Sequence, residues 1–174
     1  MARPSRRAAL LDAAVAVIRR DGARALTLDA VAAEAGVSKG GVLYHFASKR
    51  ALIDGLLERW LDDFDARLGD KPIAVAYVHA CDLSDASPDL SASEFGMLAA
   101  LIDEPHVLEA ARERYAEWME RMLASPLDPV DAWLVRLAGD GLWYADLLGI
   151  APPAGEDRRR LLARLVALAG GDAE

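Results

Sequence analysis

Hydrophobic residues recur every three to four positions along almost the whole chain, and this spacing restricts the possible folds more than any other feature. Segment 5–20 is one example, with four apolar side chains on one helical face: Leu11, Ala14, Val15 and Ile18. The alternation of Val, Ile, Thr and Tyr that is typical of strands never lasts more than a few residues. The sequence therefore predicts an all-α protein.

Capping residues, glycines and prolines divide this periodic sequence into about nine helices. Thr27 and Ser38 are favourable N-caps, and Gly36 is well placed to end a helix between them. Prolines begin or separate the later helices. The expected helices cover residues 5–20, 28–35, 39–46, 48–68, 72–82, 88–102, 105–124, 129–148 and 156–169.

The charge of the chain is divided unevenly. The total of −8 argues against a nucleic-acid partner, because binding to phosphate depends on Lys and Arg. Residues 1–50, however, carry nine basic and four acidic side chains, a net of +5, whereas residues 51–174 carry 11 basic and 24 acidic ones, a net of −13. We therefore expect a DNA-binding domain over residues 1–50 and a second domain over residues 51–174, connected by the helix 48–68.

Cysteine content and hydropathy indicate the compartment. Cys81 is the only cysteine, so an intramolecular disulfide and a four-cysteine zinc site are excluded. No apolar run approaches the roughly 18–20 residues that a membrane span needs. We expect a soluble cytoplasmic protein with no membrane partner, cofactor or metal.

The segments 28–35 and 39–46 have the spacing of a helix-turn-helix, which docks its second helix in the major groove of DNA. Tyr44 lies on the face opposite Val42 and Phe46, so we predict that it reads base edges. Other residues in and beside these two helices are expected to hold phosphates or to let the DNA backbone approach closely. These predicted positions are Thr27, Ser38, Lys39, Gly40, Gly41 and Lys49.

The run LDAVAAEAGVSKGGVLYHFASK, residues 28–49, resembles the DNA-binding signature of the TetR family of bacterial transcriptional regulators, and the resemblance extends over residues 7–57. It implies a helical homodimer whose N-terminal helices bind a palindromic operator and whose other helices bind a small effector that releases the DNA. Leu43 departs from the pattern, because many members have a phosphate-contacting aromatic residue there. The positions that match the family's DNA contacts are Thr27, Ser38, Lys39, Gly41, Tyr44, His45 and Lys49.

Residues 51–174 are rich in aromatic and thioether side chains, which suit either an adaptable effector pocket or an ordinary core. Asp140 and Asp146 flank Trp143 in an apolar helix, where a carboxylate can receive a cationic ligand or can be exposed or paired with arginine. The candidate effector-binding residues are Trp60, Phe64, Tyr77, Phe95, Met97, Tyr115, Trp118, Met119, Met122 and Trp143.

The helices 129–148 and 156–169 are apolar on more sides than one internal partner would cover. We predict that both pack against their symmetry mates in a four-helix dimer interface; the alternative is an internal bundle in a monomer. A dimer also fits DNA geometry, since two recognition helices must meet successive major grooves roughly 34 Å apart.

Enzymatic interpretations are weaker. His79 and Cys81 are two residues apart on one helix and point to different sides. The cluster Asp103, Glu104 and His106 has no second set of ligands at metal-binding spacing. The sequence thus favours a ligand-responsive DNA-binding repressor that is not an enzyme and responds to a small, largely apolar effector. The alternative is a helical small-molecule-binding protein or enzyme without specific DNA binding.

Overall fold

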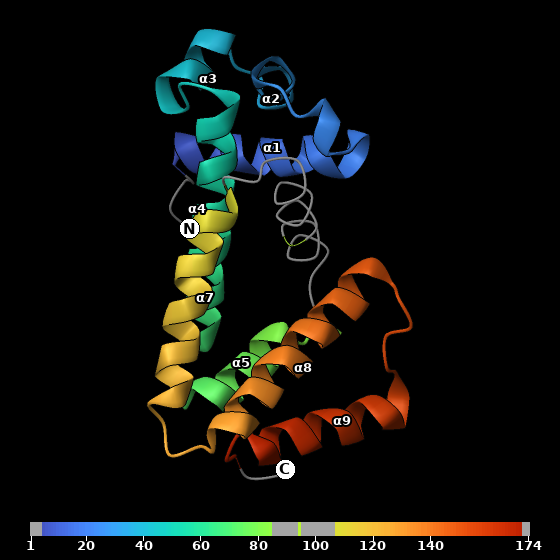
Figure 1. The fold of residues 1–174 in the computed structure, drawn as a ribbon. Coiled ribbons are helices and arrows are strands. Elements are labelled where there is room, and N and C mark those ends of the chain that lie inside the picture. Colours follow the sequence, from blue (N-terminus) through green and yellow to red (C-terminus); the bar gives the residue numbers. More distant parts are fainter. Residues whose placement is uncertain (1–4, 85–93, 95–106, 172–174) are drawn as a thin grey trace. The chain divides into compact units, whose positions relative to one another are not determined.

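The computed structural model describes residues 5–84, 94 and 107–171, and within them helices are the only regular secondary structure (Figure 1). The all-α prediction is therefore confirmed, and the expected helix 88–102 lies outside the described residues except at residue 94. One short 3₁₀ helix, η1 (Ala23–Ala25), was not predicted. The eight described α-helices are α1 (Arg6–Asp21), α2 (Leu28–Glu34), α3 (Lys39–His45), α4 (Lys49–Leu68), α5 (Ile73–Cys81), α7 (Val107–Leu123), α8 (Pro129–Leu148) and α9 (Gly155–Leu168).

The chain forms two compact units. The N-terminal unit comprises Met1–Leu61 and Pro88–Ala111, and the C-terminal unit comprises Asp62–Ser87 and Arg112–Glu174. The boundary at Leu61 lies inside α4, so this helix contributes residues to both units.

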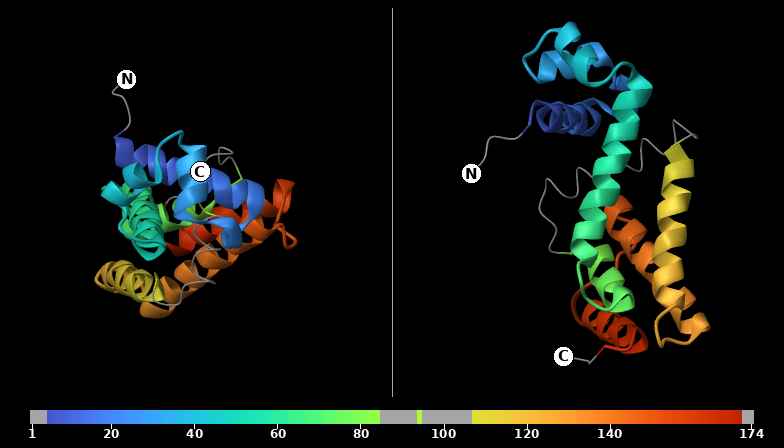
Figure 2. Two further views of the ribbon diagram at one scale, coloured as in Figure 1. Left: turned by 90° about the horizontal axis from the view of Figure 1, so that it is seen from above. Right: turned by 90° about the vertical axis from the view of Figure 1, so that its left-hand side faces the viewer.

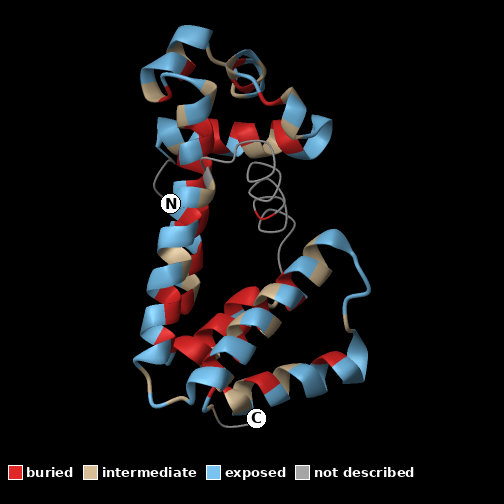
Figure 3. Ribbon diagram, viewed as in Figure 1, coloured by how far each residue is buried: buried red, intermediate tan, exposed pale blue. Residues whose placement is uncertain are grey.

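The N-terminal unit is built on α1, which packs against η1 and α2 (Figure 1). Its core takes one face from each helix, including Val17 of α1, Val31 of α2 and Val42 of α3, all fully buried. Figure 3 shows this buried face along α1. Because α2 and α3 have only seven residues each, their stability depends on this shared core more than on helix propensity.

In the C-terminal unit, α5 packs against both α8 and α9, as the views in Figure 2 show. Gly139 of α8 permits close packing: a Cβ there would lie 3.2 Å from the ring of Tyr77 and 3.3 Å from Sγ of Cys81. The apolar centre between the three helices consists of Ala74, Val78, Val135, Leu165 and Ala169.

A buried ion network joins the same three helices. Arg158 of α9 donates from Nη1 and Nη2 to the two carboxylate oxygens of Asp146 on α8, at 2.8 and 2.6 Å, and it also donates to Asp82 at the end of α5. Burial opposes the ionisation of Asp82, but hydrogen bonds from Ser84 and Arg158 outweigh it and hold the pKa of this carboxyl below its usual value. The guanidinium therefore replaces water as the partner of two carboxylates.

One face of α8 is apolar but exposed to solvent in the single chain. Its side chains follow helical spacing, and Leu137 is 56% exposed. The exposed apolar residues on this face are Val130, Trp133, Leu134, Leu137, Tyr144 and Leu148. A Cβ at Gly141 on the same helix would meet nothing within 4 Å. Contiguous apolar surface of this kind marks an interaction site.

We expect Arg158→Met to lower the free energy of unfolding by about 3 kcal/mol, because it leaves two partly buried carboxylates without their cation. The matched control is Arg159→Met, which removes an exposed guanidinium bound only by Glu156 among the described residues and should cost less than about 1 kcal/mol. Urea denaturation at pH 7 measures both variants. Equal effects would contradict a structural role for the network.

Candidate nucleic-acid interface

The turn between α2 and α3 has the geometry that the sequence predicted. Oγ1 of Thr27 accepts a hydrogen bond from the amide of Ala30 at 3.0 Å, and Oγ of Ser38 accepts one from the amide of Gly41 at 3.2 Å. Gly36 has φ of +64°, a left-handed conformation that other residues adopt only with strain. Thr27 fixes where α2 begins, Gly36 follows its end and Ser38 fixes where α3 begins, and together they define a helix-turn-helix.

The outer face of α3 presents Tyr44. Its side chain is 86% exposed, whereas Val42 on the opposite face is fully buried. The imidazole of His45 meets the ring of Tyr44 edge to face, with centroids 5.0 Å apart. An exposed aromatic hydroxyl on a recognition helix is positioned to contact base edges.

Gly40 and Gly41 leave the start of α3 without side-chain bulk. A Cβ at either position would make only ordinary contacts, the nearest being 3.6 Å from Ser38 Oγ, and neither residue has a positive φ. The fold of the described chain therefore does not require glycine at these positions. Their predicted role in close approach of DNA stays a prediction.

Residues 1–50, which we call the head, contain an ion pair at the start of α3. Nζ of Lys39 lies 2.8 Å from Oδ2 of Asp29, an ion pair that the sequence analysis did not predict. Both side chains are exposed, so such a pair is weak and can exchange partners. Of the other predicted contacts, Thr27 is exposed and Lys49 is half-buried at the start of α4.

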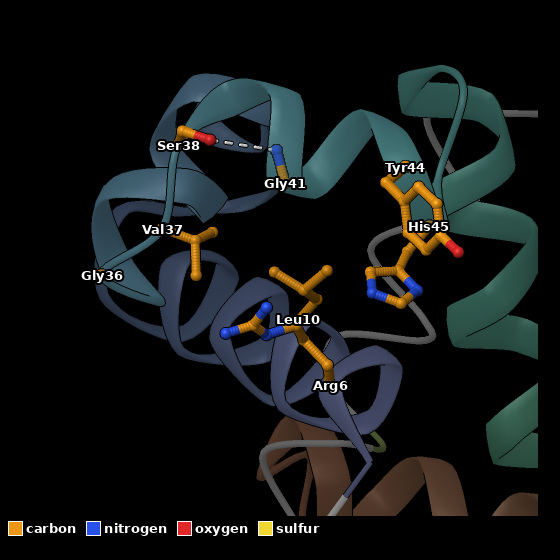
Figure 4. Close-up of a pocket in the computed structure, with 8 residues that line it drawn as sticks. All are labelled: Arg6, Leu10, Gly36, Val37, Ser38, Gly41, Tyr44 and His45. Carbon is orange, nitrogen blue, oxygen red and sulfur yellow. Dashed lines mark hydrogen bonds between the residues drawn. The ribbon is translucent and has the colours of Figure 1, made fainter.

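A shallow hollow lies beside the recognition helix. It has a volume of about 590 Å³ and is enclosed by the start of α1, the turn and α3 (Figure 4). Its lining residues are Arg6, Leu10, Gly36, Val37, Ser38, Gly41, Tyr44 and His45. Four of the predicted DNA-binding residues thus share one hollow with Arg6, which was not among them.

Four of the predicted effector residues form an aromatic cluster. In the C-terminal unit the ring centroid of Phe64 lies 4.5 Å from that of Trp118 and 5.4 Å from that of Tyr77. The ring centroids of Tyr115 and Trp118 are 4.9 Å apart. Met119 and Met122 are buried in the same unit. We call Phe64, Tyr77, Tyr115 and Trp118 the ring cluster.

Two other predicted effector residues have contacts of a different kind. Trp143 pairs with Tyr144 on α8. Trp60 belongs to the N-terminal unit, where its indole N–H donates to the fully buried carboxylate of Glu94. Phe95 and Met97 lie outside the described residues.

Carboxylates border the ring cluster, and the sequence analysis did not include one of them, Asp65. Oδ1 of Asp65 accepts from the indole of Trp118 at 2.7 Å, and its Oδ2 accepts from Arg114. Because Arg114 and Trp118 are four residues apart on α7, one carboxylate of α4 holds a full turn of α7. A signal in the sequence was available, since a buried indole N–H needs an acceptor.

Asp140 is the second carboxylate beside these rings. It accepts from the hydroxyl of Tyr77 at 2.6 Å and pairs with Arg136 at 3.0 Å. Burial raises the pKa of Asp140, and the hydrogen bond from Tyr77 and the charge of Arg136 oppose that rise only in part. Together with the Arg158–Asp146 pair, this confirms the arginine-paired alternative for Asp140 and Asp146.

The described residues do not support a metal site, a His79–Cys81 catalytic pair or a membrane span. No group of three or more His, Cys, Asp or Glu side chains with metal-binding geometry occurs among the described residues, and Asp103, Glu104 and His106 fall outside them. His79 is exposed whereas Cys81 is buried, so the two side chains point to different sides as predicted. Among the described helices, none has the length and apolar character needed to cross a membrane.

Comparison with protein-family models gives two matches. Residues 10–56 match the family described as bacterial regulatory proteins, tetR family, and residues 71–170 match the tetracyclin repressor-like C-terminal domain. The first match contains the whole helix-turn-helix. The second alone covers more than half of the chain.

Among curated proteins, the HTH-type transcriptional repressor KstR2 of Mycobacterium tuberculosis is 42% identical over 66 residues. That alignment covers 38% of this chain and 33% of KstR2, so the match spans about a third of the relative's length. KstR2 of Rhodococcus jostii is 40% identical over 58 residues, which is 33% of this chain and 28% of that protein.

Two solved structures resemble nearly the whole chain. The multidrug binding protein EbrR complexed with malachite green has a TM-score of 0.70 at 26% identity, covering 93% of this chain and 98% of that one. A member of the TetR family from Streptomyces coelicolor A3 has a TM-score of 0.68 at 28% identity, with the same coverage.

Proposed function

Because this chain belongs to the tetR family of bacterial regulatory proteins, we propose that it is a transcriptional repressor that binds a palindromic DNA operator as a homodimer. A small, largely apolar effector binds the second domain and releases the DNA. The observation that carries this proposal is Tyr44, almost fully exposed on the second helix of a capped helix-turn-helix. Acting on the chromosome, the regulator works in the cytoplasm, and no cofactor or catalytic step is part of its action.

We assign DNA binding to residues 1–50 and effector binding and dimerisation to residues 51–174, with α4 as the connection. The proposed DNA contacts are those of the helix-turn-helix and its borders: Thr27, Ser38, Lys39, Gly40, Gly41, Tyr44, His45 and Lys49. Thr27, Ser38, Lys39 and Lys49 position the protein on the phosphates, whereas Tyr44 reads the sequence. The alternative, a helical small-molecule-binding protein or enzyme, would bind DNA only weakly and without sequence preference.

The direct test of the reading face uses the duplex that the wild-type chain selects from a random-sequence library. We expect Tyr44→Ala to lose about 1–3 kcal/mol of preference for that duplex over unrelated DNA, because base contacts carry the discrimination. Lys49→Ala should weaken binding to both duplexes equally. It should also reduce the slope of log K against log salt by about 0.9 for each bound head. Fluorescence anisotropy at several salt concentrations measures both.

The matched control for the lysine is Lys71→Ala, which removes the same charge from an exposed position in the C-terminal unit. It should leave affinity and salt slope unchanged. If Tyr44→Ala and Lys49→Ala both bind like the wild type, the assigned reading face is wrong. If the wild-type chain selects no sequence, the alternative function is favoured.

The proposed dimer rests on the exposed apolar face of α8. A second copy is the partner that best fits it, because a palindrome requires two heads related by a two-fold axis and such an axis pairs identical surfaces. We propose that α8 and α9 of two copies form a four-helix interface. The exposed Leu161 of α9 extends the apolar surface to the second helix.

We expect Leu137→Glu to convert the dimer to a monomer at micromolar concentration, because it places a carboxylate in the middle of the apolar face. Leu123→Glu is the control: Leu123 is a similarly exposed leucine, 41%, on α7. Light scattering coupled to size exclusion gives the mass of each variant. A Leu137→Glu protein that remains dimeric would place the interface elsewhere.

The proposed effector site includes the ring cluster. Its side chains supply aromatic surface, and Asp65 and Asp140 provide polar groups at its edge. The likeness to EbrR, solved with malachite green, supports an aromatic effector. The residues proposed to contact it are Trp60, Phe64, Tyr77, Phe95, Met97, Tyr115, Trp118, Met119, Met122 and Trp143.

Effector binding and DNA release can be tested together by linkage. A thermal-shift screen of small aromatic compounds identifies those that bind the folded chain, since such compounds raise its melting temperature by mass action. We expect at least one of them to weaken binding to the selected duplex about 5- to 150-fold, and the duplex to weaken its binding by the same factor. Stabilising compounds that leave DNA affinity unchanged would contradict the proposed release.

A further inference from the structure

We infer that Arg6, the first residue of α1, is a phosphate contact of the DNA interface, although it lies outside the helix-turn-helix. This inference rests on the proposed function. Arg6 is exposed and lines the hollow beside α3 together with Tyr44 and His45 (Figure 4). A residue 38 positions before Tyr44 in the sequence thus borders the same surface as the proposed base-reading side chain.

Arg6 differs from three cations of residues 1–50 that already have carboxylate partners. Arg7 donates to Glu58 at 2.8 Å and its guanidinium lies over the ring of Phe46, 5.3 Å from the centroid. Arg20 is bound by Asp21 and Glu34, and Lys39 by Asp29. Arg6, by contrast, has no hydrogen bond or ion pair with any other residue that the structure describes. Its five donors are available without first breaking an internal pair.

The surroundings of Arg6 favour an anion. The residues that line the hollow include two hydroxyls and an imidazole but no carboxylate. Leu10 and Val37 supply the apolar part of the lining. A guanidinium in such a setting binds the two oxygens of a phosphate as a fork, which a lysine ammonium does not reproduce.

The DNA backbone is the source of phosphate that fits this position. When α3 lies in the major groove, the strands that border the groove pass beside the ends of that helix. The hollow borders the exposed Tyr44 and therefore opens where duplex would lie, rather than inside the protein. We assign to Arg6 one backbone phosphate of the operator half-site, a contact that positions the head but does not read sequence.

The experiment measures the salt dependence of binding to the selected duplex and to unrelated DNA. We expect Arg6→Ala to reduce the slope of log K against log salt by about 0.9 for each bound head. Its affinity for both duplexes should fall by a similar factor. Arg6→Lys should keep the slope but bind less tightly, because it keeps the charge and loses the fork. Arg121→Ala, which removes an exposed arginine of α7, should change neither quantity.

Circular dichroism melts confirm that each variant is folded. A wild-type slope for folded Arg6→Ala, while Tyr44→Ala still loses sequence preference, would overturn the inference and leave the proposed function intact. Failure of the wild-type chain to select any duplex would overturn both.

A second measurement separates backbone phosphate from a free anion. Inorganic phosphate is titrated into the DNA-free protein in 0.15 M salt while the NMR signals of His45 and Gly41 are followed. We expect no saturable shift. A saturable shift at millimolar phosphate that disappears in Arg6→Ala would assign the hollow to a small anion and overturn the DNA contact.

Discussion

The contact between Phe46 and Gly55 holds the recognition helix to α4, and the remainder of the head depends on it. A Cβ at residue 55 would lie 2.8 Å from Cε1 of Phe46, a separation that real Cβ atoms do not adopt, so only glycine leaves room for the buried ring. Phe46 directly follows α3 and also receives the guanidinium of Arg7 over its face. The ring thus joins α1, α3 and α4 at one point, and α3 has only seven residues with which to hold itself in place.

Ion pairs add orientation to this contact. Arg7 reaches Glu58 and Arg59 reaches Asp12, so α1 and α4 exchange guanidinium–carboxylate pairs in both directions. Individually such pairs on a surface stabilise little. Their value here is geometric, because together with Phe46 they restrict rotation of α1 about α4. Further along α4, Asp65 holds Arg114 and Trp118 of α7. A ligand that displaces α7 would therefore act on a helix whose first turns are fixed to the DNA-reading head.

Interactions between residues close together in the sequence could be predicted, whereas interactions between residues far apart in the sequence could not. The helix-turn-helix followed from Thr27, Gly36 and Ser38, because a cap acts on amides two or three residues away. The binding of Trp118 by Asp65, 53 residues earlier, and of Asp82 by Arg158, 76 residues later, depends on packing that local pattern does not contain. For the same reason the contact of Trp60 with Glu94, 34 residues later, could not be predicted from the sequence.

The net charge of residues 1–50 does not distinguish cations that are already paired from cations that are free to bind phosphate. The net of +5 over residues 1–50 correctly separates a basic segment from an acidic one, but it treats all cations as equal. In the folded head Arg7, Arg20 and Lys39 already have carboxylate partners, and each must exchange that partner to bind a phosphate. Exchange conserves one ion pair, so it contributes less to affinity than a new pair does. The long-range field that attracts DNA follows the net charge, whereas the contacts that hold it follow the unpaired groups.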